Sequence, residues 1–399
     1  MTRVAYLVPE WPSQTHAFFH RELSALRGLG DTVFLFSTRR PPDDACRHDF
    51  AVEARATTHY VFPPRVATAA AMLARRPASA AKALAYVATL SETSPKGRAR
   101  LVALLACAAD LVARAEELGV EHLHVHSCAD AAHLAVMVHL LSPGITYSLT
   151  LHGDLPVYGV DHAKKMERAA FVSAVTRPLQ KQIVDATSLR EARVPVITMG
   201  VDTDRFSPPA SRSSDEGALR LLTVARLNPT KGHVHALEAV RRVREKGLDV
   251  RYTIAGSGPH EAAVRAAIAE RGLESSVEML GSIGEEEVLA RLRASDAFVL
   301  PSFGLGEAAP VSVMEAMATG LPVICSLIGG TGDMITDGVD GFLVPQQDED
   351  ALADRIERLS RDASLRATIG AAARRRAVDV FDYRKTAKAL HDAIAAARH

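Results

Sequence analysis

The chain has 399 residues, 48% of them hydrophobic, which is enough for the cores of two domains of average size. Lys plus Arg and Asp plus Glu both number 47, so no net charge attracts a nucleic acid or a membrane surface. Four scattered cysteines form no C-x-x-C pair, and no apolar run reaches the length of a membrane span. The first residues do not resemble a signal peptide, and we expect a cytoplasmic protein.

Short apolar runs in the amino-terminal half predict the strands of a parallel sheet. They are Val4–Val8, Thr32–Phe36, the run around His122–His126, Ile145–Leu151, Phe171–Val175 and Val194–Thr198. The loop after the first strand, Pro9–Gln14, contains no glycine, which argues against the G-x-G-x-x-G loop of an NAD enzyme. Ser13 is a candidate N-cap for the helix that ends near Gly30.

Residues 65–100 carry seven basic side chains and one acid, Glu92, on a background of alanine and leucine. One interpretation is a pair of surface helices broken by Pro77 and Pro95. The other is a basic helical face that contacts anionic lipid weakly at the inner side of a membrane, where a lipid-linked acceptor would be held.

His122, His124 and His126 alternate on a predicted strand and therefore share one face. Three such histidines could bind a metal, but no carboxylate or cysteine follows at ligand spacing, so we expect no metal site. His126 stands at the carboxyl end of its strand, where α/β sheets bind ligands, and is the histidine of the three expected to reach a substrate. His152 and Asp154 follow the next strand at the same edge; the alternative for His152 is a core histidine with satisfied hydrogen bonds.

The carboxyl-terminal half repeats the alternation of strand and helix after a Ser-, Asp- and Gly-rich boundary at residues 211–217. The predicted strands are Leu219–Ala225, Val250–Ala255, Val277–Leu280 and Ala297–Leu300. Arg226 and Lys231 follow the first of these strands, just before a helix. Two cations beside a helix N-terminus suit a pyrophosphate leaving group, although such a pair elsewhere would be ordinary surface charge.

Ser302–Gly320 is the most informative stretch of the chain. A helix is predicted to start near Pro310 and to stop at Gly320, which places Glu307 in the preceding loop and Glu315 inside the helix. The helix N-terminus favours a phosphate, whereas two carboxylates would repel one. We therefore expect the carboxylates to accept hydrogen bonds from ribose and sugar hydroxyls, as in a nucleoside diphosphate sugar. The alternative is an amphipathic helix with two solvated glutamates.

These motifs resemble a known enzyme family. The E-x7-E pattern from Glu307 to Glu315, with the following E-A-M-A-T-G-L-P-V-I-C, Gly329-Gly330 and D-G-V-D-G-F-L-V-P, resembles the signature of retaining glycosyltransferases of the family-4 type. The S-Q-T-H-A-F-F-H-R-E-L run from Ser13 resembles the exopolysaccharide branch of that family, which also includes enzymes of secondary metabolism.

The resemblance implies the GT-B fold, an α/β architecture of two Rossmann-like, doubly wound parallel-sheet domains that face each other across a cleft. It implies an acceptor domain at residues 1–199, a nucleotide-sugar domain at 200–378, and a terminal helix at 379–399 that crosses back to the amino domain. In this frame Asp202-Thr203-Asp204 belongs to the linker between the domains and is not a metal-binding D-x-D motif.

The implied reaction transfers a hexosyl unit from a nucleotide sugar, most often UDP-linked, to a small-molecule or lipid-linked acceptor hydroxyl, with anomeric retention. No metal or other cofactor is needed, because Arg226 and Lys231 would stabilise the diphosphate. The resemblance assigns Glu315 to the ribose, Glu307 to sugar hydroxyls and His152 to the ordering of the sugar. Further expected donor contacts are Gly256, Gly258, Ile283, Ala308, Ala309, Pro310 and Val311. Weaker expectations on the acceptor side are Ser13, Thr15, His126 and Asp154.

Two other functions fit the same donor site: a nucleotide-sugar epimerase or hydrolase, and a nucleotide-sugar-binding protein without catalysis. Asp154 is the one carboxylate next to His152 that could act as a covalent nucleophile. Gly153 favours a bend there, because glycine has no Cβ and adopts turn conformations freely. We therefore expect transfer without a covalent intermediate.

Overall fold

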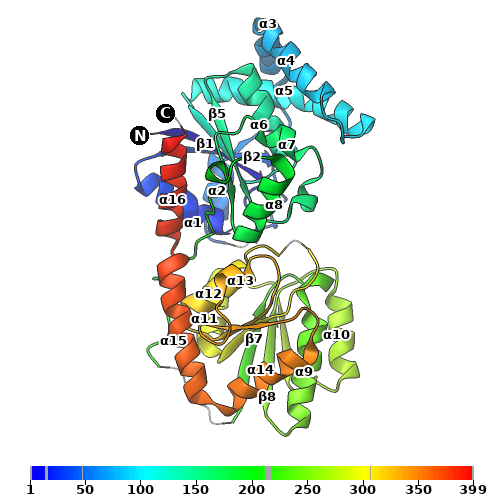
Figure 1. Cartoon of the computed structure of the whole chain (residues 1–399), viewed down its shortest axis with the longest axis vertical. Coiled ribbons are helices and arrows are strands. Elements are labelled where there is room, and N and C mark those ends of the chain that lie inside the picture. The colour runs from blue at the N-terminus through cyan, green and yellow to red at the C-terminus, as the bar shows by residue number, and fades with distance from the viewer. Residues whose placement is uncertain (1, 14–16, 47, 212–216, 306, 398–399) are drawn as a thin grey trace. The chain divides into compact units, whose positions relative to one another are not determined.

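The chain forms two compact units, each with a parallel sheet of six strands (Figure 1). This computed structural model describes residues 2–13, 17–46, 48–211, 217–305 and 307–397. Unit 1 comprises residues 1–198 and 386–399, and unit 2 comprises residues 199–385. The last helix therefore joins the unit formed by the start of the chain.

The sheet of unit 1 has the strand order β3-β2-β1-β4-β5-β6, with all strands parallel. The strands are β1 (Arg3–Glu10), β2 (Thr32–Arg39), β3 (His59–Tyr60), β4 (His122–Val125), β5 (Thr146–Leu151) and β6 (Val172–Ala174). The helices are α1 (Ala17–Gly28), α2 (Ala51–Thr57), α3 (Val66–Arg75), α4 (Pro77–Ala88), α5 (Pro95–Glu117), α6 (Asp130–Leu141), η1 (Leu155–Tyr158), α7 (His162–Met166), α8 (Arg177–Thr187), η2 (Glu191–Arg193) and α16 (Tyr383–Ala396).

Local sequence explains where several of these helices begin. Pro77 and Pro95 each open a helix, α4 and α5, because proline needs no partner for an N–H at this position. The side chain of Ser94 caps α5 by accepting from the backbone N–H of Gly97, and Thr176 caps α8 by accepting from that of Leu179. The basic segment thus contains α3, α4 and the start of α5, where we expected a pair of helices.

The predicted strand at Val194–Thr198 is wrong. Only Val196 forms a β-bridge there, to Ala174 of β6. The carbonyl of Pro195 accepts from Ala174 and the N–H of Ile197 donates to Ala174, so one residue of β6 serves both contacts. Pro195 has no N–H to extend the ladder, which accounts for the short pairing.

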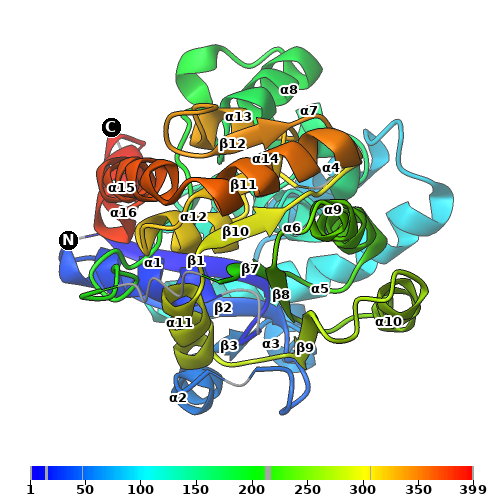
Figure 2. The same cartoon turned by 90° about the horizontal axis from the view of Figure 1, so that it is seen from below.

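The sheet of unit 2 has the order β12-β11-β10-β7-β8-β9, which Figure 2 shows from one edge to the other. Counted within its own unit, this is the same order as in unit 1 and that of the doubly wound dinucleotide-binding fold. The strands are β7 (Leu219–Val224), β8 (Val250–Ala255), β9 (Val277–Gly281), β10 (Ala297–Leu300), β11 (Val323–Ser326) and β12 (Phe342–Val344). The helices are η3 (Pro229–Lys231), α9 (His233–Glu245), α10 (Glu261–Glu270), α11 (Glu285–Ala294), α12 (Val311–Ala318), α13 (Thr331–Met334), α14 (Glu349–Arg361) and α15 (Ala363–Val380).

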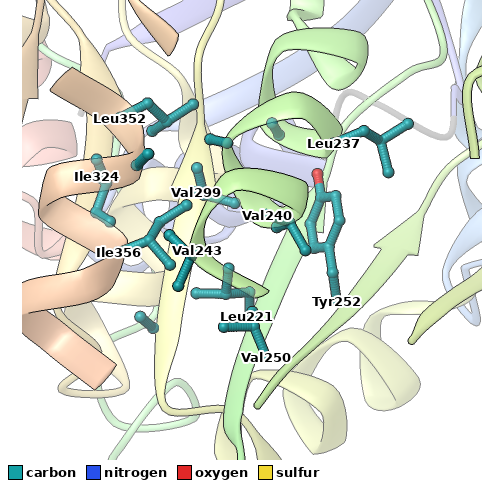
Figure 3. Close-up of a cluster of buried hydrophobic side chains, with 14 of the residues drawn as sticks. Leu221, Leu237, Val240, Val243, Val250, Tyr252, Val299, Ile324, Leu352 and Ile356 are labelled. Carbon is teal, nitrogen blue, oxygen red and sulfur yellow. The ribbon is translucent and has the colours of Figure 1, made fainter. Parts of the chain in front are cut away.

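One apolar cluster joins α9, α10 and α14 to the same face of this sheet (Figure 3). Leu237 and Val240 of α9 and Ile356 of α14 pack with Leu221 and Val299 of the strands, and all five are fully buried. Figure 2 shows α11 and α12 on the opposite face. Helices on both faces leave the strand ends as the natural place for a site.

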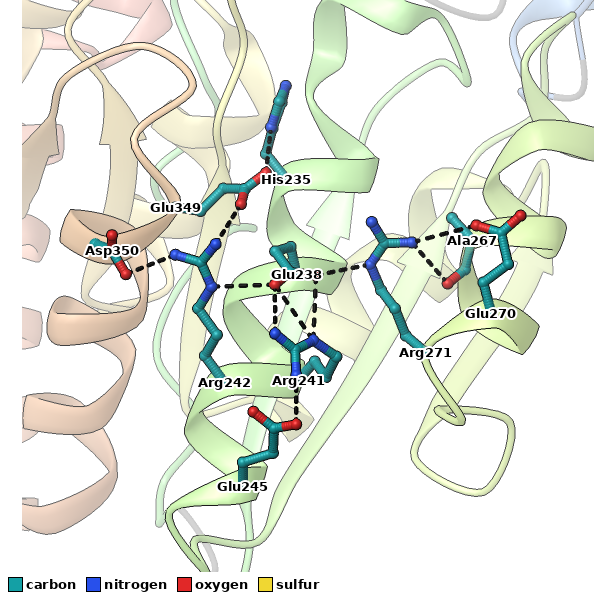
Figure 4. Close-up of polar contacts among 10 residues, drawn as sticks. All are labelled: His235, Glu238, Arg241, Arg242, Glu245, Ala267, Glu270, Arg271, Glu349 and Asp350. Atoms are coloured by element: carbon teal, nitrogen blue, oxygen red, sulfur yellow. Dashed lines mark hydrogen bonds and ion pairs between the residues drawn. The ribbon is translucent and has the colours of Figure 1, made fainter.

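An ion-pair network supports the helical layer of this face (Figure 4). Glu238 of α9 lies at its centre and accepts hydrogen bonds from Arg241, Arg242 and Arg271. Arg242 also reaches Glu349 of α14, at 2.7 Å from Nη2 to Oε2. The hydrogen bond from Arg241, with the neighbouring arginines, lowers the pKa of Glu238 to about 2, so this carboxyl is ionised at neutral pH.

The D-T-D string forms a turn next to α16. Asp202 accepts hydrogen bonds from the backbone N–H groups of Asp204 and Arg205, each at 3.1 Å. Asp204 pairs with Arg384, at 2.7 Å from Nη1 to Oδ2. These contacts fix the turn at residues 202–205 and tie it to the start of α16.

Candidate functional site

The strand order of unit 2 reverses between β7 and β10, and the loops after these strands lie against each other. The backbone N–H of Phe303 donates to the carbonyl of Thr230, at 2.8 Å. Gly232 has a φ of +72°, and a Cβ there would overlap the carbonyl of Pro301. The backbone of the loop that carries Lys231 therefore packs directly against the backbone of the loop that follows β10.

Lys231 and Glu307 form an ion pair at this switch point. The Glu307 side chain is only 11% exposed, and it also accepts from the hydroxyl of Ser302, at 2.9 Å. Sequence reasoning assigned Lys231 to a diphosphate and Glu307 to a sugar, and the structure brings the two side chains into contact. Because Lys231 compensates the buried charge, Glu307 can act as a hydrogen-bond acceptor there.

The loop before α12 is fixed by a third segment, which follows β11. A Cβ on Gly329 would overlap the carbonyl of Glu307, and the N–H of Gly330 donates to the carbonyl of Ala308, at 2.7 Å. Ala308 and Ala309 are buried. The segment 329–330 thus holds the main chain of residues 307–309 in place.

Helix α12 begins at Val311. Pro310 is therefore the residue just before the helix and not a residue of its first turn. Val311 is half-buried. Glu315 lies in the second turn and is half-buried too.

Arg226 lies in the loop after β7, whose main chain is held from two sides. The ring of His233, the first residue of α9, donates from Nε2 to the carbonyl of Arg226, at 3.2 Å. Cβ atoms on Gly256 and Gly258 would overlap the carbonyls of Ala225 and Leu227. These two glycines therefore let the loop after β8 pass directly against the loop that carries Arg226. The half-buried Ile283 lies in the loop after β9.

The corresponding switch point of unit 1 lies between β1 and β4. Ser13 follows β1 and is half-buried, whereas Thr15 and the cap proposed for Ser13 lie outside the described residues. His126 directly follows β4, and its side chain is only 1% exposed. It was expected to reach a substrate, but the structure turns it inward, with Nδ1 at 2.9 Å from Nε2 of His152.

His122 and His124 belong to a buried hydrogen-bonded row. His122 contacts Thr146 and Ser148, at 2.8 and 2.6 Å, and His124 contacts Ser148 and Thr150, at 2.7 and 3.0 Å. Burial lowers the pKa of His124 well below its usual value, so its ring is neutral. Among the described residues no group of three His, Cys, Asp or Glu side chains is placed to hold a metal ion.

His152 follows β5 and is held by its main chain as well as its ring. Its backbone N–H donates to the hydroxyl of Tyr158, at 2.8 Å. The buried ammonium of Lys165 donates to the carbonyl of the same tyrosine, at 3.1 Å. Asp154 accepts from the side-chain amide of Gln182 of α8, at 2.8 Å, and so its carboxylate is engaged with the scaffold.

A carboxylate lies behind the two histidines of unit 1. Glu22 of α1 accepts from the hydroxyl of Tyr6, at 2.6 Å, and its Oε1 lies 3.2 Å from Nε2 of His126. Burial raises the pKa of Glu22, while the Tyr6 hydroxyl and the imidazoles of His124 and His152 act in the opposite direction. Sequence reasoning did not identify Glu22, although it is part of the run from Ser13 that resembles the exopolysaccharide branch.

Much of the positive charge of residues 65–100 is engaged within unit 1. Four of the seven basic side chains have partners: Arg65 with Asp110, Arg76 with Glu116, Arg98 with the carbonyl of Leu90, and Arg100 with Asp130. Arg75, Lys82 and Lys96 have no such partner among the described residues. Within the same described ranges, we find no helix whose length and hydrophobicity would suffice to cross a membrane.

Residues 205–376 match the family model described as "Glycosyl transferases group 1". The match lies within unit 2. The amylovoran biosynthesis glycosyltransferase AmsK of Erwinia amylovora is 34% identical over 238 residues, 58% of each chain. WcaL of Escherichia coli (strain K12), named as a colanic acid biosynthesis glycosyltransferase, is 40% identical over 173 residues, 42% of each chain. The matched regions thus span about half the length of these curated relatives.

Solved structures match nearly the whole chain and show its fold. Anabaena Alr3699/HepE in complex with UDP aligns with a TM-score of 0.75 and 16% identity, over 99% of this chain and 100% of that one. Sucrose-phosphate synthase (tll1590) from Thermosynechococcus elongatus aligns with a TM-score of 0.73 and 19% identity, over 98% of both chains. The predicted fold is confirmed: both units are Rossmann-like, and the chain has the GT-B fold.

Proposed function

We propose that the protein transfers a sugar from a nucleoside diphosphate sugar to an acceptor hydroxyl, with retention of the anomeric configuration. The observation that carries the proposal is the Lys231–Glu307 pair, placed before α12 at the switch point of unit 2, which contains the match to the group 1 model. A cation, a compensated carboxylate and a helix N-terminus together suit a ligand that offers both a diphosphate and hydroxyl groups.

We assign the parts of the donor as follows. Arg226 and Lys231 bind the diphosphate, Glu315 accepts from the ribose, and Glu307 accepts from the hydroxyls of the sugar. The main chain of residues 308–311 and the loops at Gly256, Gly258 and Ile283 complete the donor site. UDP is the proposed nucleotide, with support from HepE, whose structures include complexes with UDP and with UDP-glucose.

The transfer step needs no resident cofactor in this scheme. The bond between the anomeric carbon and the diphosphate oxygen breaks, and its electron pair leaves with the diphosphate. The acceptor oxygen bonds to the same face of the anomeric carbon, and its proton passes to the departing phosphate oxygen. Arg226 and Lys231 stabilise the charge that develops on the leaving group. His152 orders the sugar, and Asp154, held by Gln182, does not form a covalent intermediate.

The acceptor is proposed to be a growing exopolysaccharide or its lipid-linked precursor. Support comes from the relatives AmsK and WcaL, whose names refer to the polysaccharides amylovoran and colanic acid. For the weak contact of residues 65–100 with a lipid surface, Arg75, Lys82 and Lys96 supply the available charge. We expect this contact to be weak, because each basic residue near such a surface contributes about 1 kcal/mol.

The test begins with calorimetric titration of the full chain with UDP- and GDP-linked sugars. Arg226→Ala is expected to weaken binding of the nucleoside diphosphate by about 1–3 kcal/mol, the range for a charge-assisted contact. Arg251→Ala is the matched control, since Arg251 is an exposed arginine near the amino end of β8. Equal affinities of the two variants would contradict the diphosphate site.

The second arm identifies the product with the donor that binds. A new glycoside with the anomeric configuration of the donor, seen by NMR, is the expected result. An inverted anomer would contradict retention. Free sugar would indicate a hydrolase, an altered nucleotide sugar an epimerase, and binding without any product a nucleotide-sugar-binding protein.

A further inference from the structure

Helix α1 packs against His126 and His152, the two histidines at the switch point of unit 1. Phe18 and Phe19 lie four and three residues before Glu22, so each is a neighbour of Glu22 on the surface of the helix. The Phe19 ring meets His126 edge-on, with centroids 4.7 Å apart, and the Phe18 ring lies 5.3 Å from that of His152. Both phenylalanines are buried, so the histidines are enclosed by apolar side chains.

Glu22 is the charged group in this enclosure. Its Oε1 accepts from the Tyr6 hydroxyl at 2.6 Å and lies 3.2 Å from Nε2 of His126. Nδ1 of His126 is in turn 2.9 Å from Nε2 of His152. Glu22, His126 and His152 therefore form a continuous chain of polar contacts from α1 to the loop after β5.

The positions of the hydrogens along this chain are coupled. Oε1 of Glu22 lies close to Nε2 of His126 without the alignment of a hydrogen bond, so an ionised carboxylate acts there through its charge. That charge favours a hydrogen on Nε2, and Nδ1 of a neutral His126 is then an acceptor. Nε2 of His152 must supply the hydrogen for the contact between the rings, which leaves Nδ1 of His152 as an acceptor. The carboxylate thus sets the tautomer of a ring that it does not touch, as the outer partners of functional histidines commonly do.

We propose that Glu22 is a positioning residue that acts through His126 to hold His152 in the tautomer with Nε2 protonated. The part that this tautomer has in ordering the sugar rests on the function proposed above. The inference also gives a role to the A-F-F-H-R-E-L run of α1, which supplies the carboxylate and the two aromatic walls.

Glu22→Gln tests the proposal because it keeps the size of the side chain and replaces one acceptor oxygen by an NH2 donor. With its oxygen toward the Tyr6 hydroxyl, the amide would turn its NH2 group toward Nε2 of His126 and favour an unprotonated Nε2, and every hydrogen along the chain would reverse. Nδ1 of His152 would then carry the hydrogen. Nitrogen-15 NMR of the full chain with labelled histidine distinguishes the two tautomers, with His152 assigned from a His152→Gln sample.

Ser148→Ala is the matched control. Ser148 is buried in the same polar layer and contacts His122 and His124, so its loss disturbs the neighbouring row. The expected result is an Nε2-protonated His152 in the wild type and in Ser148→Ala, and an Nδ1-protonated His152 in Glu22→Gln. The proposal would be overturned if the wild-type His152 ring were protonated at Nδ1, or if the ring of Glu22→Gln had the same tautomer as the wild type. If the variant fails to fold, the wild-type spectrum alone still tests the proposal.

Kinetics separate this inference from the proposed function. Glu22→Gln is expected to lower kcat for transfer by about 10- to 100-fold, the usual cost of losing such an outer partner, with little change in KM for the donor. A reversed tautomer with unchanged kcat would overturn the positioning role. A reversed tautomer in a chain whose wild type transfers no sugar would refute the proposed function and leave the Glu22–His126–His152 chain standing.

Discussion

The two units have sheets of the same strand order, but their switch points are held in different ways. In unit 2, the four loops after β7, β8, β10 and β11 are packed main chain against main chain, with Gly232, Gly256 and Gly329 at the closest approaches. In unit 1, the loop after β1 contains no glycine, and the functional candidates are held by side chains such as Glu22 and Gln182. One topology can therefore position a site either through its backbone or through buried polar side chains.

Glycine replacement provides the strongest test of this difference. Gly329→Ala places a Cβ on the carbonyl of Glu307 and adds the strain of a positive φ. We expect a loss of about 2–5 kcal/mol, from roughly 1–2 for the left-handed backbone and 1–3 for the overpacking. Hydrogen exchange of the β7 and β8 amides reports the free energy of unfolding of unit 2 separately.

Gly338→Ala is the control for backbone strain alone. Gly338 has a φ of +74°, and a Cβ there would meet no atom within 4 Å. It is expected to cost only the strain contribution, about 1–2 kcal/mol. Equal losses in the two variants would show that the contact between Gly329 and Glu307 contributes nothing to the packing of the loops.

Removal of the ring of His152 tests whether the site of unit 1 depends on side chains held in place by buried polar contacts. His152→Ala is expected to reduce turnover by roughly 10²-fold or more, the range for a positioned group, while nucleotide affinity is retained because the proposed diphosphate contacts lie in unit 2. Asp154→Asn should keep substantial activity, since the asparagine oxygen can still accept from Gln182. Steady-state kinetics and nucleotide titration provide both values.

A covalent intermediate on Asp154 would contradict the roles proposed for His152 and Asp154. A sugar adduct on Asp154, detected by mass spectrometry of the enzyme during turnover, would make this carboxylate a nucleophile. Loss of activity in Asp154→Asn together with such an adduct would contradict transfer without a covalent intermediate.

The smallest expected effect concerns the charge network of unit 2. The pKa of Glu238 is about 2 in the folded chain against an ordinary value of 4.5, so its stabilisation is complete above pH 4.5 and is lost as the pH falls through 2. Glu238→Gln should lower the free energy of unfolding at pH 7 by about 1–2 kcal/mol, between an exposed pair and a buried charged hydrogen bond.

The matched control is Glu245→Gln, because Glu245 also pairs with Arg241 but is largely exposed. We expect a change of less than about 0.5 kcal/mol for this variant. The difference between wild type and Glu238→Gln should shrink between pH 4.5 and pH 2 in denaturant unfolding. A difference that stays constant over this range would mean that the ionised carboxylate is not what stabilises the helices.

The sequence predicted the repeating α/β pattern and the position of Glu307 before α12 and of Glu315 within it, because both depend on residues that are close together in the chain. Glu307 and Glu315 lie within a few residues of the end of β10 and of the start of α12, so the order of residues already determines their place. The Lys231–Glu307 contact could not be predicted in this way, since it depends on how two separate loops approach each other.

The site of unit 1 was less predictable for the same physical reason. The expectation for His126 relied on the alternation of side chains along a strand, which gives the face but not what covers it. The covering residue, Glu22, comes from α1, about a hundred residues earlier in the chain. A buried carboxylate in an apolar helix face, close to the run Phe18-Phe19, was the one signal that could have indicated it.

The return of the chain from unit 2 to unit 1 determines the order in which the protein can mature during synthesis. The six strands of unit 1 are complete by Ala174, but the part of α16 that belongs to this unit begins at Thr386, after all of residues 199–385. Until then, Asp31 lacks its contact with His391, and Leu390 and Ile394 have not yet been added to the core. Unit 2 is a continuous stretch and can close first, whereas unit 1 needs a segment that is made only after the whole of unit 2.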